Sequence, residues 1–515
     1  MMVVEKVPNE IEVNKELIEK KEHGKANFET AIRATGFGKF NVLLLLTSVP
    51  TCWASIFQLT TISYVFPAAQ CDLKLSLEDK GMLSGVTFGG MMFSAFLWGF
   101  LYDTYGRRSL LTIGYFLDAL FVILSSFAQS IEFLMMTKFL GGFIISGPFA
   151  ALATYFSEMH DSKNRPRVPF IMGIFYALGG IYLPLLASLI LPLNVHWKIG
   201  ENLVLNSWGI FLLINAIPSI LSGLIFCFLP ESPKFLMSMG RNEEALSVFQ
   251  TIYSLNTGRK KTSFPIKELI MEKPKSLEDS QDSFLVSRYK QLRELFEPKL
   301  LKIFILVCFL QMFMTTSFFT LRIWMPQLFQ AINDYKFINN GTSSNLCDML
   351  TVLKRAKTTK ECFVNFENFE VYINSMIVCI TSMAGYFVAG GLINLIGQNK
   401  LLGIISFISG CSALGIYYSP NGTTATIFIA ACSSTASISV NAIIVVIVNL
   451  FPTTLRTIAL SLTMIFGRIA VMLGNMIFPI LLESGCLPPF LSFTFLGFAC
   501  TIITMLLPKK NLNFT

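Results

Sequence analysis

Charged side chains are scarce in this chain: they make up 14% of its 515 residues, whereas 53% are hydrophobic. Soluble globular chains carry about a quarter charged residues, so this composition excludes an ordinary soluble domain. Histidine is scarcer still, and its three copies, His23, His160 and His196, lie far apart in the sequence. No nucleophile–base pair or metal-ligand spacing accompanies them. We therefore expect the chain not to be an enzyme and to bind neither a metal ion nor a cofactor.

Apolar sequence is what the chain has in abundance. Stretches of about 20 apolar residues, enough to cross a hydrocarbon core about 30 Å thick, recur along almost its whole length. We predict an all-α polytopic membrane protein with twelve transmembrane helices, at roughly 40–66, 81–101, 109–128, 133–157, 168–193, 207–229, 301–331, 371–396, 400–418, 424–451, 456–482 and 488–507. The predicted order is an N-terminal tail (1–39), a six-helix bundle (40–229), a central loop (230–300), a second six-helix bundle (301–507) with a long loop at 332–370, and a C-terminal tail (508–515).

The basic residues predict the orientation of these helices. The 230–300 segment and the short loops on the side of the chain termini are rich in arginine and lysine, whereas the short loops on the opposite side hold only Lys74, Lys80 and Lys198. Cytoplasmic loops carry the excess of basic residues. We therefore expect both tails and the central loop in the cytoplasm. Topology thus explains the net charge of +8, and no nucleic-acid partner is expected.

The 332–370 loop, expected outside the cytoplasm, carries two further features. Cys347 and Cys362 both fall in it, and an oxidising lumen or cell exterior would favour a disulfide between them. Asn340 begins an Asn-Gly-Thr sequence, which is a glycosylation acceptor on the expected side of the membrane. Most of the remaining cysteines lie inside apolar spans and are interpreted as small packing residues.

An internal repeat divides the chain. A shift of 291 positions, from 99 to 390, places GFLYDTYGRRSLL (99–111) over GGLINLIGQNKLL (390–402), and the same shift places Glu158 over Asn449. Transporters are commonly built from such repeats. We therefore interpret the chain as a duplicated six-plus-six bundle whose halves rock about a site at the membrane midplane.

The charged residues of this repeat lie at the cytoplasmic helix ends and are candidates for a gate. Opposite charges at matching depth can pair across helix ends and hold one side shut while the halves rock. The alternative is that these residues only enforce topology and solvate the helix ends. The second copy has Asn394 and Asn449 in place of the acids, so we expect a weakened lock and a resting state open to the cytoplasm. The candidate gate residues are Asp103, Gly106, Arg107, Arg108, Glu158, Arg165, Glu231 and Arg456.

Three motifs at these positions resemble those of a known family. G-x-L-x-D-x-x-G-R-R at 99–108, E-x6-R at 158–165 and P-E-S-P-K at 230–234 resemble the major facilitator superfamily in its sugar-porter and organic-ion branch. The segments GFGKFN, PAAQCDLKLS, YFSEM, LGGIYLP and TLRIWMPQLF resemble synaptic vesicle glycoprotein 2 and its insect relatives, with similarity over about 28–507. The resemblance implies a twelve-helix alternating-access fold with a central cavity open to one side at a time.

The chain departs from that family at positions that bear on coupling. Ser55 and Gln58 stand where the synaptic vesicle proteins carry an Asp-x-x-Glu pair, and Asn441 begins Asn-Ala-Ile-Ile where they carry Asn-Ala-x-Asp. Buried carboxylates are the usual means of coupling transport to protons. Without them we expect facilitated transport or exchange rather than proton symport.

The resemblance also selects candidate binding residues, because cavity walls in the family come mainly from spans one, four, seven and ten. Arg468 is the main candidate, since organic-anion carriers have a basic residue at the similar position. A guanidinium with aromatic rings suits an amphiphilic organic anion. Arg322 and Lys138 add positive charge, and the alternative for both is snorkelling to the membrane interface. The candidates are Gln58, Tyr176, Arg322, Trp324, Tyr386, Asn441 and Arg468.

The sequence therefore favours a transporter of a small organic solute, an organic anion first, that works by alternating access. We expect a monomeric unit in the lipid bilayer of the plasma membrane or of a vesicle. The alternative is a transport-defective relative that acts in binding or vesicle trafficking. The missing acids favour the alternative, whereas the retained gate residues favour the transporter.

Overall fold

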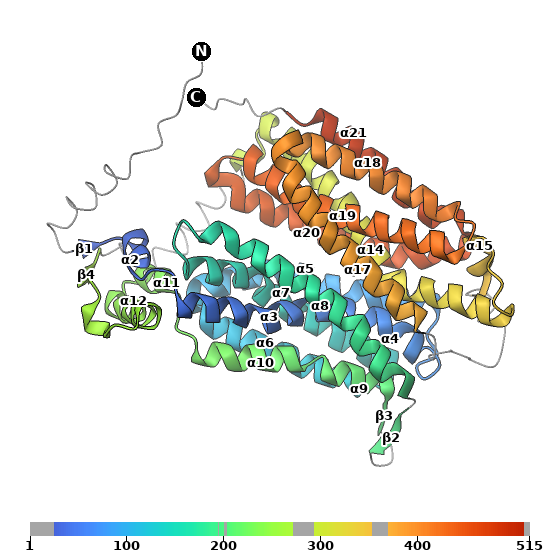
Figure 1. Cartoon of the computed structure of the whole chain (residues 1–515), viewed down its shortest axis with the longest axis horizontal. Helices are drawn as coiled ribbons and strands as arrows, with labels where there is room; N and C mark the ends of the chain where they lie inside the picture. Colours follow the sequence, from blue (N-terminus) through green and yellow to red (C-terminus); the bar gives the residue numbers. More distant parts are fainter. Residues whose placement is uncertain (1–24, 194, 200–202, 271–292, 353–368, 509–515) are drawn as a thin grey trace.

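The computed structural model describes residues 25–193, 195–199, 203–270, 293–352 and 369–508. Eleven helical segments in this part of the chain are long and apolar enough to cross a membrane. Helix α5 (Leu77–Tyr105), of 29 residues, runs beside them. The predicted twelve-helix architecture is confirmed, and Figure 1 shows the two halves side by side with their helices nearly parallel.

Each half contains six spans. In the N-terminal half they are α3 (Lys39–Thr60) continued by α4 (Ile62–Ala69), α5, α6 (Arg107–Ser126), α7 (Ile131–Glu158), α8 (Val168–Ile190), and α9 (Ser207–Ile214) continued by α10 (Ile217–Phe228). In the C-terminal half they are α14 (Pro298–Ile338), α17 (Glu370–Ile396), α18 (Gln398–Tyr417), α19 (Gly422–Leu450), α20 (Thr453–Ser484) and α21 (Leu487–Leu506).

Local sequence sets several helix boundaries. Ser76 and Asp79 form a capping box that satisfies the first free N–H groups of α5. The sixth span is interrupted after Ile214, and Pro218 lies in the first turn of the helix that follows, where its missing N–H costs nothing. Helix α14 continues to Ile338, beyond the predicted end of the seventh span at 331.

The predicted central loop is partly folded. It contains α11 (Pro233–Ser238), α12 (Asn242–Thr257) and β4 (Glu268–Leu269), and β4 pairs in parallel with β1 (Lys25–Ala26) of the N-terminal tail. Helix α2 (Phe28–Ala34) packs on these elements through a buried apolar cluster that includes Phe28 and Phe249. Residues 25–34 therefore belong to a small folded unit. This unit lies on one end of the bundle, and we call that end the α12 face.

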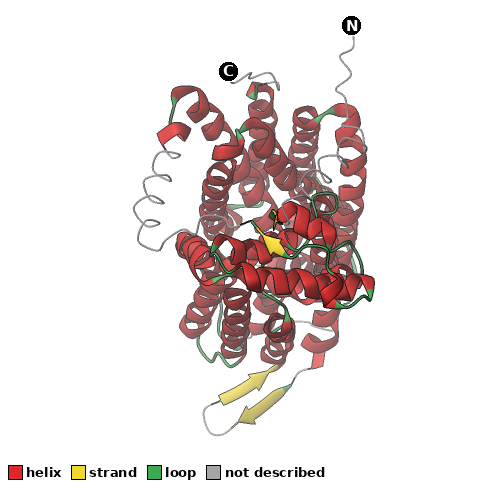
Figure 2. Ribbon diagram, turned by 90° about the vertical axis from the view of Figure 1, so that its left-hand side faces the viewer, coloured by secondary structure: helices red, strands yellow, loops and turns green. Residues whose placement is uncertain are grey.

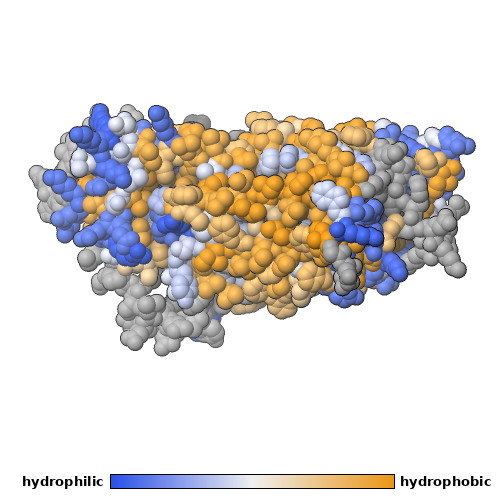
Figure 3. Space-filling view, turned by 90° about the horizontal axis from the view of Figure 1, so that it is seen from below, coloured by the Kyte–Doolittle hydropathy of each residue, from blue (hydrophilic) through white to orange (hydrophobic). Residues whose placement is uncertain are grey.

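The opposite end of the bundle, here called the α15 face, carries α15 (Leu346–Met349) and an antiparallel hairpin of β2 (His196–Ile199) and β3 (Leu203–Asn206). Figure 2 shows this hairpin extending past the rim of the helices. Between the two faces the surface is a broad apolar belt bounded by hydrophilic ends (Figure 3). Such a belt suits a bilayer that surrounds the middle of the bundle.

Buried apolar side chains of the two halves meet near the α15 face. A large buried apolar cluster includes side chains of both halves near the α15 face, among them Phe66, Trp324 and Phe478. Nearer the α12 face a second cluster contains residues of the C-terminal half alone, such as Val307 and Ile447. Among the described residues, apolar packing therefore joins the halves from the α15 face inward.

Candidate functional site

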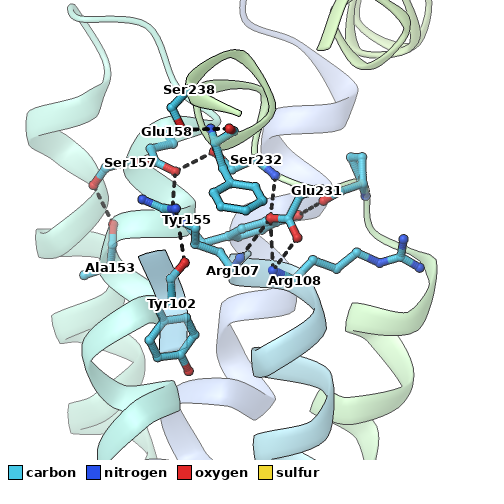
Figure 4. Close-up of polar contacts among 12 residues, drawn as sticks. Tyr102, Arg107, Arg108, Ala153, Tyr155, Ser157, Glu158, Glu231, Ser232 and Ser238 are labelled. Atoms are coloured by element: carbon cyan, nitrogen blue, oxygen red, sulfur yellow. Dashed lines mark hydrogen bonds and ion pairs between the residues drawn. The ribbon is translucent and has the colours of Figure 1, made fainter. Parts of the chain in front are cut away.

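Glu231 is at the centre of a polar cluster on the α12 face of the N-terminal half (Figure 4). Helix α5 ends at Tyr105, and Gly106 turns the chain with a φ of +90°, which glycine adopts without strain. The Glu231 carboxylate accepts hydrogen bonds from the backbone N–H groups of Arg107 at 3.0 Å, Arg108 at 3.1 Å and Ser232 at 2.8 Å. It thereby satisfies the free N–H groups at the start of α6 and faces the positive end of the helix dipole.

Glu158, at the end of α7, is the second acid of this cluster. Its carboxylate is buried, lies 3.6 Å from Nε of Arg107, and accepts a hydrogen bond from the Ser232 hydroxyl. The Arg107 guanidinium also lies 5.0 Å from the centre of the Phe235 ring. A sheltered ion pair with further hydrogen bonds holds α6, α7 and α11 in one arrangement.

Arg165 extends the cluster to the N-terminal segment. Its guanidinium donates to the carbonyl oxygens of Ser157 and His160 and to Oε1 of Glu29 on α2. Arg108 instead donates to the carbonyl oxygen of Phe226 on α10. Together these contacts connect the ends of four spans with the folded unit of the α12 face.

Four of the predicted gate residues therefore join one another within the N-terminal half: Arg107, Arg108, Glu158 and Glu231. Among the described residues, the hydrogen bonds and ion pairs of Arg165 and Glu231 have no partner in the C-terminal half. The Asp103 side chain lies outside the described residues. The cluster is thus a brace inside one half in this arrangement, and its role as a gate between halves stays a prediction.

The second copy of the motif keeps the turn and loses the charges. Gly397 has a φ of +85°, close to the value at Gly106. The Asn449 amide donates to Oε1 of Gln398 where the first copy has an acid and an arginine. Nε of Arg456 is buried and has no hydrogen-bond partner in the described part of the chain. The C-terminal half therefore has a weaker brace than the N-terminal half.

Hydrogen bonds between the halves lie from the α15 face to the middle of the bundle. Nη1 of Arg468 on α20 donates to the carbonyl oxygen of Met91 on α5 at 2.9 Å and to the Ser146 hydroxyl on α7 at 3.0 Å. Nearer the α15 face the Cys379 thiol donates to the carbonyl oxygen of Gly180 at 3.0 Å. Arg468 therefore faces the other half rather than lipid, and its role in substrate binding stays a prediction.

Arg322 also faces the interface between the halves. Its Nη2 lies 2.7 Å from where a Cβ on Gly180 would be, so the glycine leaves room for the guanidinium next to α8. Its guanidinium interacts with the Cys379 thiol and with Tyr64 on α4. Snorkelling to the membrane surface is therefore the wrong interpretation of Arg322. It is also wrong for Lys138, which is fully buried and interacts with Asp118.

The other candidate binding residues have different surroundings. Tyr386 and Asn441 meet, because the Asn441 amide donates to the tyrosine oxygen at 2.8 Å. Trp324 instead packs between Phe66 and Phe478 in the core. Gln58 is buried, and Tyr176 lies beside Ser55 and Cys52. The contacts of Arg468 in the described part of the chain are with Met91 and Ser146 rather than with these residues.

One polar contact between the halves escaped the sequence-based prediction. Lys80 is almost completely buried, and its ammonium donates to Oε1 of Gln70 at 2.8 Å and to Oε1 of Gln327 on α14 at 2.8 Å. The sequence pattern places this lysine only in a short loop. Lys80 lies within the first turn of an apolar span, where a buried charge needs partners. That position could have indicated a buried polar contact.

The predicted disulfide between Cys347 and Cys362 is wrong. Cys347 is bonded to Cys486, which is 139 residues away in the sequence, and Cys362 lies outside the described residues. Short helix α15 brings Cys347 against the turn between α20 and α21, a proximity that loop membership does not reveal. Asn340 is exposed after α14, and its glycosylation stays a prediction.

Comparisons with known proteins agree with this architecture. Residues 50–353 match the model of the Major Facilitator Superfamily. The chain is similar to synaptic vesicle glycoprotein 2B of Rattus norvegicus, with 32% identity over 249 residues that are 48% of this chain and 36% of that protein. It is also similar to the synaptic vesicle 2-related protein of Xenopus laevis, with 25% identity over 457 residues that are 89% of this chain and 76% of that protein.

Solved structures agree with the fold. The inward open conformation of the xylose transporter XylE from E. coli superposes with a TM-score of 0.67 at 12% identity, covering 92% of this chain and 98% of that one. The chain spans only 36% of the length of the rat synaptic vesicle glycoprotein 2B that it matches. The family model, in contrast, covers more than half of this chain. Members of this family are membrane transporters rather than enzymes, and the chain belongs to the major facilitator superfamily.

Proposed function

We propose that this protein carries a small organic anion across the membrane by alternating access. The observation that supports it is the pair of arginines, Arg322 and Arg468, at the interface between the halves. Neither forms an ion pair with a carboxylate in the described part of the chain, and their partners there are carbonyl, hydroxyl, thiol and phenol groups. A substrate carboxylate or sulfate would supply the missing countercharge.

The energetics of burial support the same proposal. A guanidinium inside a membrane bundle is costly unless it is paired or hydrated. Neutral acceptors such as the Met91 carbonyl and the Ser146 hydroxyl compensate part of that cost. An anion bound at Arg468 would compensate more, and it would lie between α20 of one half and α5 and α7 of the other. Binding would thus favour one arrangement of the halves over another.

We propose facilitated transport or exchange as the mode of transport. Ser55 and Gln58 are both buried on α3, and Asn441 lies on α19. At these positions inside the membrane, neutral residues stand in place of the acids that would take up a proton during transport. The proposed cytoplasmic location of the α12 face, which rests on the excess of basic loop residues, makes the described arrangement inward-facing, with the halves in contact near the α15 face.

A second candidate function is binding or trafficking in a vesicle membrane without transport. It is supported by the names of the similar proteins, which refer to synaptic vesicles, and by the same missing acids. Under this alternative the two arginines would hold a ligand or stabilise the interface, and the halves would not exchange their contacts.

Uptake by the purified protein in liposomes separates the two functions. A panel of labelled organic anions and cations should show uptake of at least one anion. Arg468→Ala should lower that uptake at least about tenfold, because an ion contact worth about 1.5–3 kcal/mol is lost. Arg468→Lys should retain part of it, and the exposed surface variant Arg241→Ala should match the wild type. Uptake of cations alone, unaffected at Arg468, would contradict the anion proposal. Folded protein that transports nothing would favour the binding function.

A further inference from the structure

The hairpin of β2 and β3 on the α15 face has two chemically different sides. Antiparallel partners point to the same side of a hairpin, and the register pairs Trp197 with Leu205 and Ile199 with Leu203. One side is therefore entirely apolar. The other side carries the intervening residues, which include two basic or titratable groups and an amide: His196, Lys198, Val204 and Asn206.

The apolar side is exposed where it leaves the bundle. Trp197 is 62% exposed and Ile199 is 49% exposed. Leu205, nearer the base, is buried and lies against Gly209 of α9. The apolar side is therefore the side that faces the spanning helices, and its outer part continues beyond them without a protein partner among the described residues.

The polar side is held from the opposite direction. The Asn206 amide donates to Oδ2 of Asp72 at 2.7 Å, and Nδ1 of His196 lies 2.8 Å from the Asn206 side-chain oxygen. Gln129, in the turn between α6 and α7, donates to the carbonyl oxygen of Val204 at 2.9 Å. These contacts tie the hairpin to residues of the connecting turns and hold it in this orientation.

The hairpin projects sideways rather than along the bundle. Figures 1 and 2, which are related by a quarter turn, both show it extending beyond the rim of the helices at the α15 face. The chain that leads into it carries exposed Leu189 and Leu193, so the apolar belt of the bundle continues onto Trp197 and Ile199. That belt is the lipid-facing surface of a membrane transporter.

We propose that this hairpin lies in the interface of the surrounding bilayer and binds phospholipid in the leaflet next to the α15 face. Tryptophan favours the boundary between headgroups and acyl chains. Trp197 and Ile199 would rest on that boundary, while Lys198 on the other side reaches lipid phosphate groups. The proposal depends on neither the transported solute nor the orientation of the protein.

Photo-crosslinking tests the proposal directly. Benzoylphenylalanine at position 197 or, as the matched control, at position 198 would be introduced into the full-length protein in nanodiscs of phosphatidylcholine and phosphatidylglycerol. Mass spectrometry should find lipid adducts several-fold more often at 197 than at 198. Equal yields at the two positions would overturn the proposal. Adducts at 197 to a second copy of the protein would overturn it too, since they would show a protein partner.

Fluorescence quenching gives a second, independent measurement with a milder substitution. Lipids brominated near the headgroup end of the acyl chains quench indole groups at that depth. Trp197→Phe should lower the fraction of protein fluorescence that these lipids quench. Trp324→Phe, which removes an indole from the buried core, should not lower it. An unchanged quenched fraction in Trp197→Phe would place the hairpin in water and overturn the proposal.

Discussion

Glu231→Gln should destabilise the N-terminal half without removing a single apolar contact. The substitution keeps the shape of the side chain and removes its charge. Its carboxylate accepts hydrogen bonds from the N–H groups of Arg107, Arg108 and Ser232. All three N–H groups donate to Oε1, so an amide oxygen at that position keeps these contacts. The NH2 group of the amide replaces Oε2, which also accepts from the N–H of Arg108 at 3.1 Å. The loss therefore includes at least one hydrogen bond and the favourable interaction with the start of α6.

The magnitude follows from these contacts. A hydrogen bond to a charged group contributes about 1.5–3 kcal/mol and one to a neutral group about 0.5–1.5 kcal/mol. The interaction of a charge with a helix terminus adds about 0.3–2 kcal/mol. Because part of the hydrogen bonding survives, we expect a loss of about 2–4 kcal/mol. For a chain of 515 residues that corresponds to a fall of about 2–4 °C in the thermal midpoint, measured on purified protein in one detergent.

Glu244→Gln is the matched control for this measurement. Glu244 also forms an ion pair, with Arg241, but both side chains are more than half exposed. Exposed pairs contribute about 0–1 kcal/mol, so its midpoint should stay near that of the wild type. Equal midpoints for the wild type and Glu231→Gln would refute the reasoning. So would an equal fall in both variants, since the loss would then reflect net charge rather than position.

Three further outcomes follow from local geometry. Gly106→Ala should lower the thermal midpoint more than Gly397→Ala. Both residues have positive φ, but of the two only a Cβ at 106 would meet a carboxylate oxygen, at 2.5 Å. Equal falls in the two variants would contradict this expectation. Burial lowers the pKa of His160 below 6.5, so just below that pH the unfolded chain binds a proton that the folded chain does not, and stability falls on acidification. His160→Gln should therefore reduce the difference in thermal midpoint between about pH 7.5 and about pH 5.5. An unchanged difference would show that a group other than His160 causes the pH dependence. Peptide mapping without reduction should recover Cys347 linked to Cys486, and Cys486→Ser should cost about 2–4 kcal/mol; a different linkage would contradict the structure.

The sequence was most informative where a property depends on neighbouring residues. The twelve spans follow from the length of apolar runs, because every backbone polar group within a bilayer must be satisfied by its own helix. The turn at Gly106 and its repeat at Gly397 also follow from a local motif, and both have positive φ. Membership of the family was evident from the same motifs and is confirmed by the family model.

Prediction failed where the outcome depends on which distant segments touch. Cys347 had a cysteine in its own loop, yet it is bonded to Cys486, because α15 packs against the turn before α21. Trp324 packs against Phe66 and Phe478, two aromatic neighbours that the sequence did not indicate. Lys80 looked like a loop charge and instead joins the halves. In each case residue type was informative about chemistry but not about partners.

The sequence by itself thus determined that this chain spans a membrane twelve times in two related halves, because hydrophobic length and repeated motifs are properties of the chain read in order. Only the tertiary structure decided that Arg107, Glu158 and Glu231 brace one half, that Arg468 reaches the other half, and that the β2–β3 hairpin projects from the rim. Those outcomes depend on contacts between residues far apart in the sequence, which form only when the helices pack.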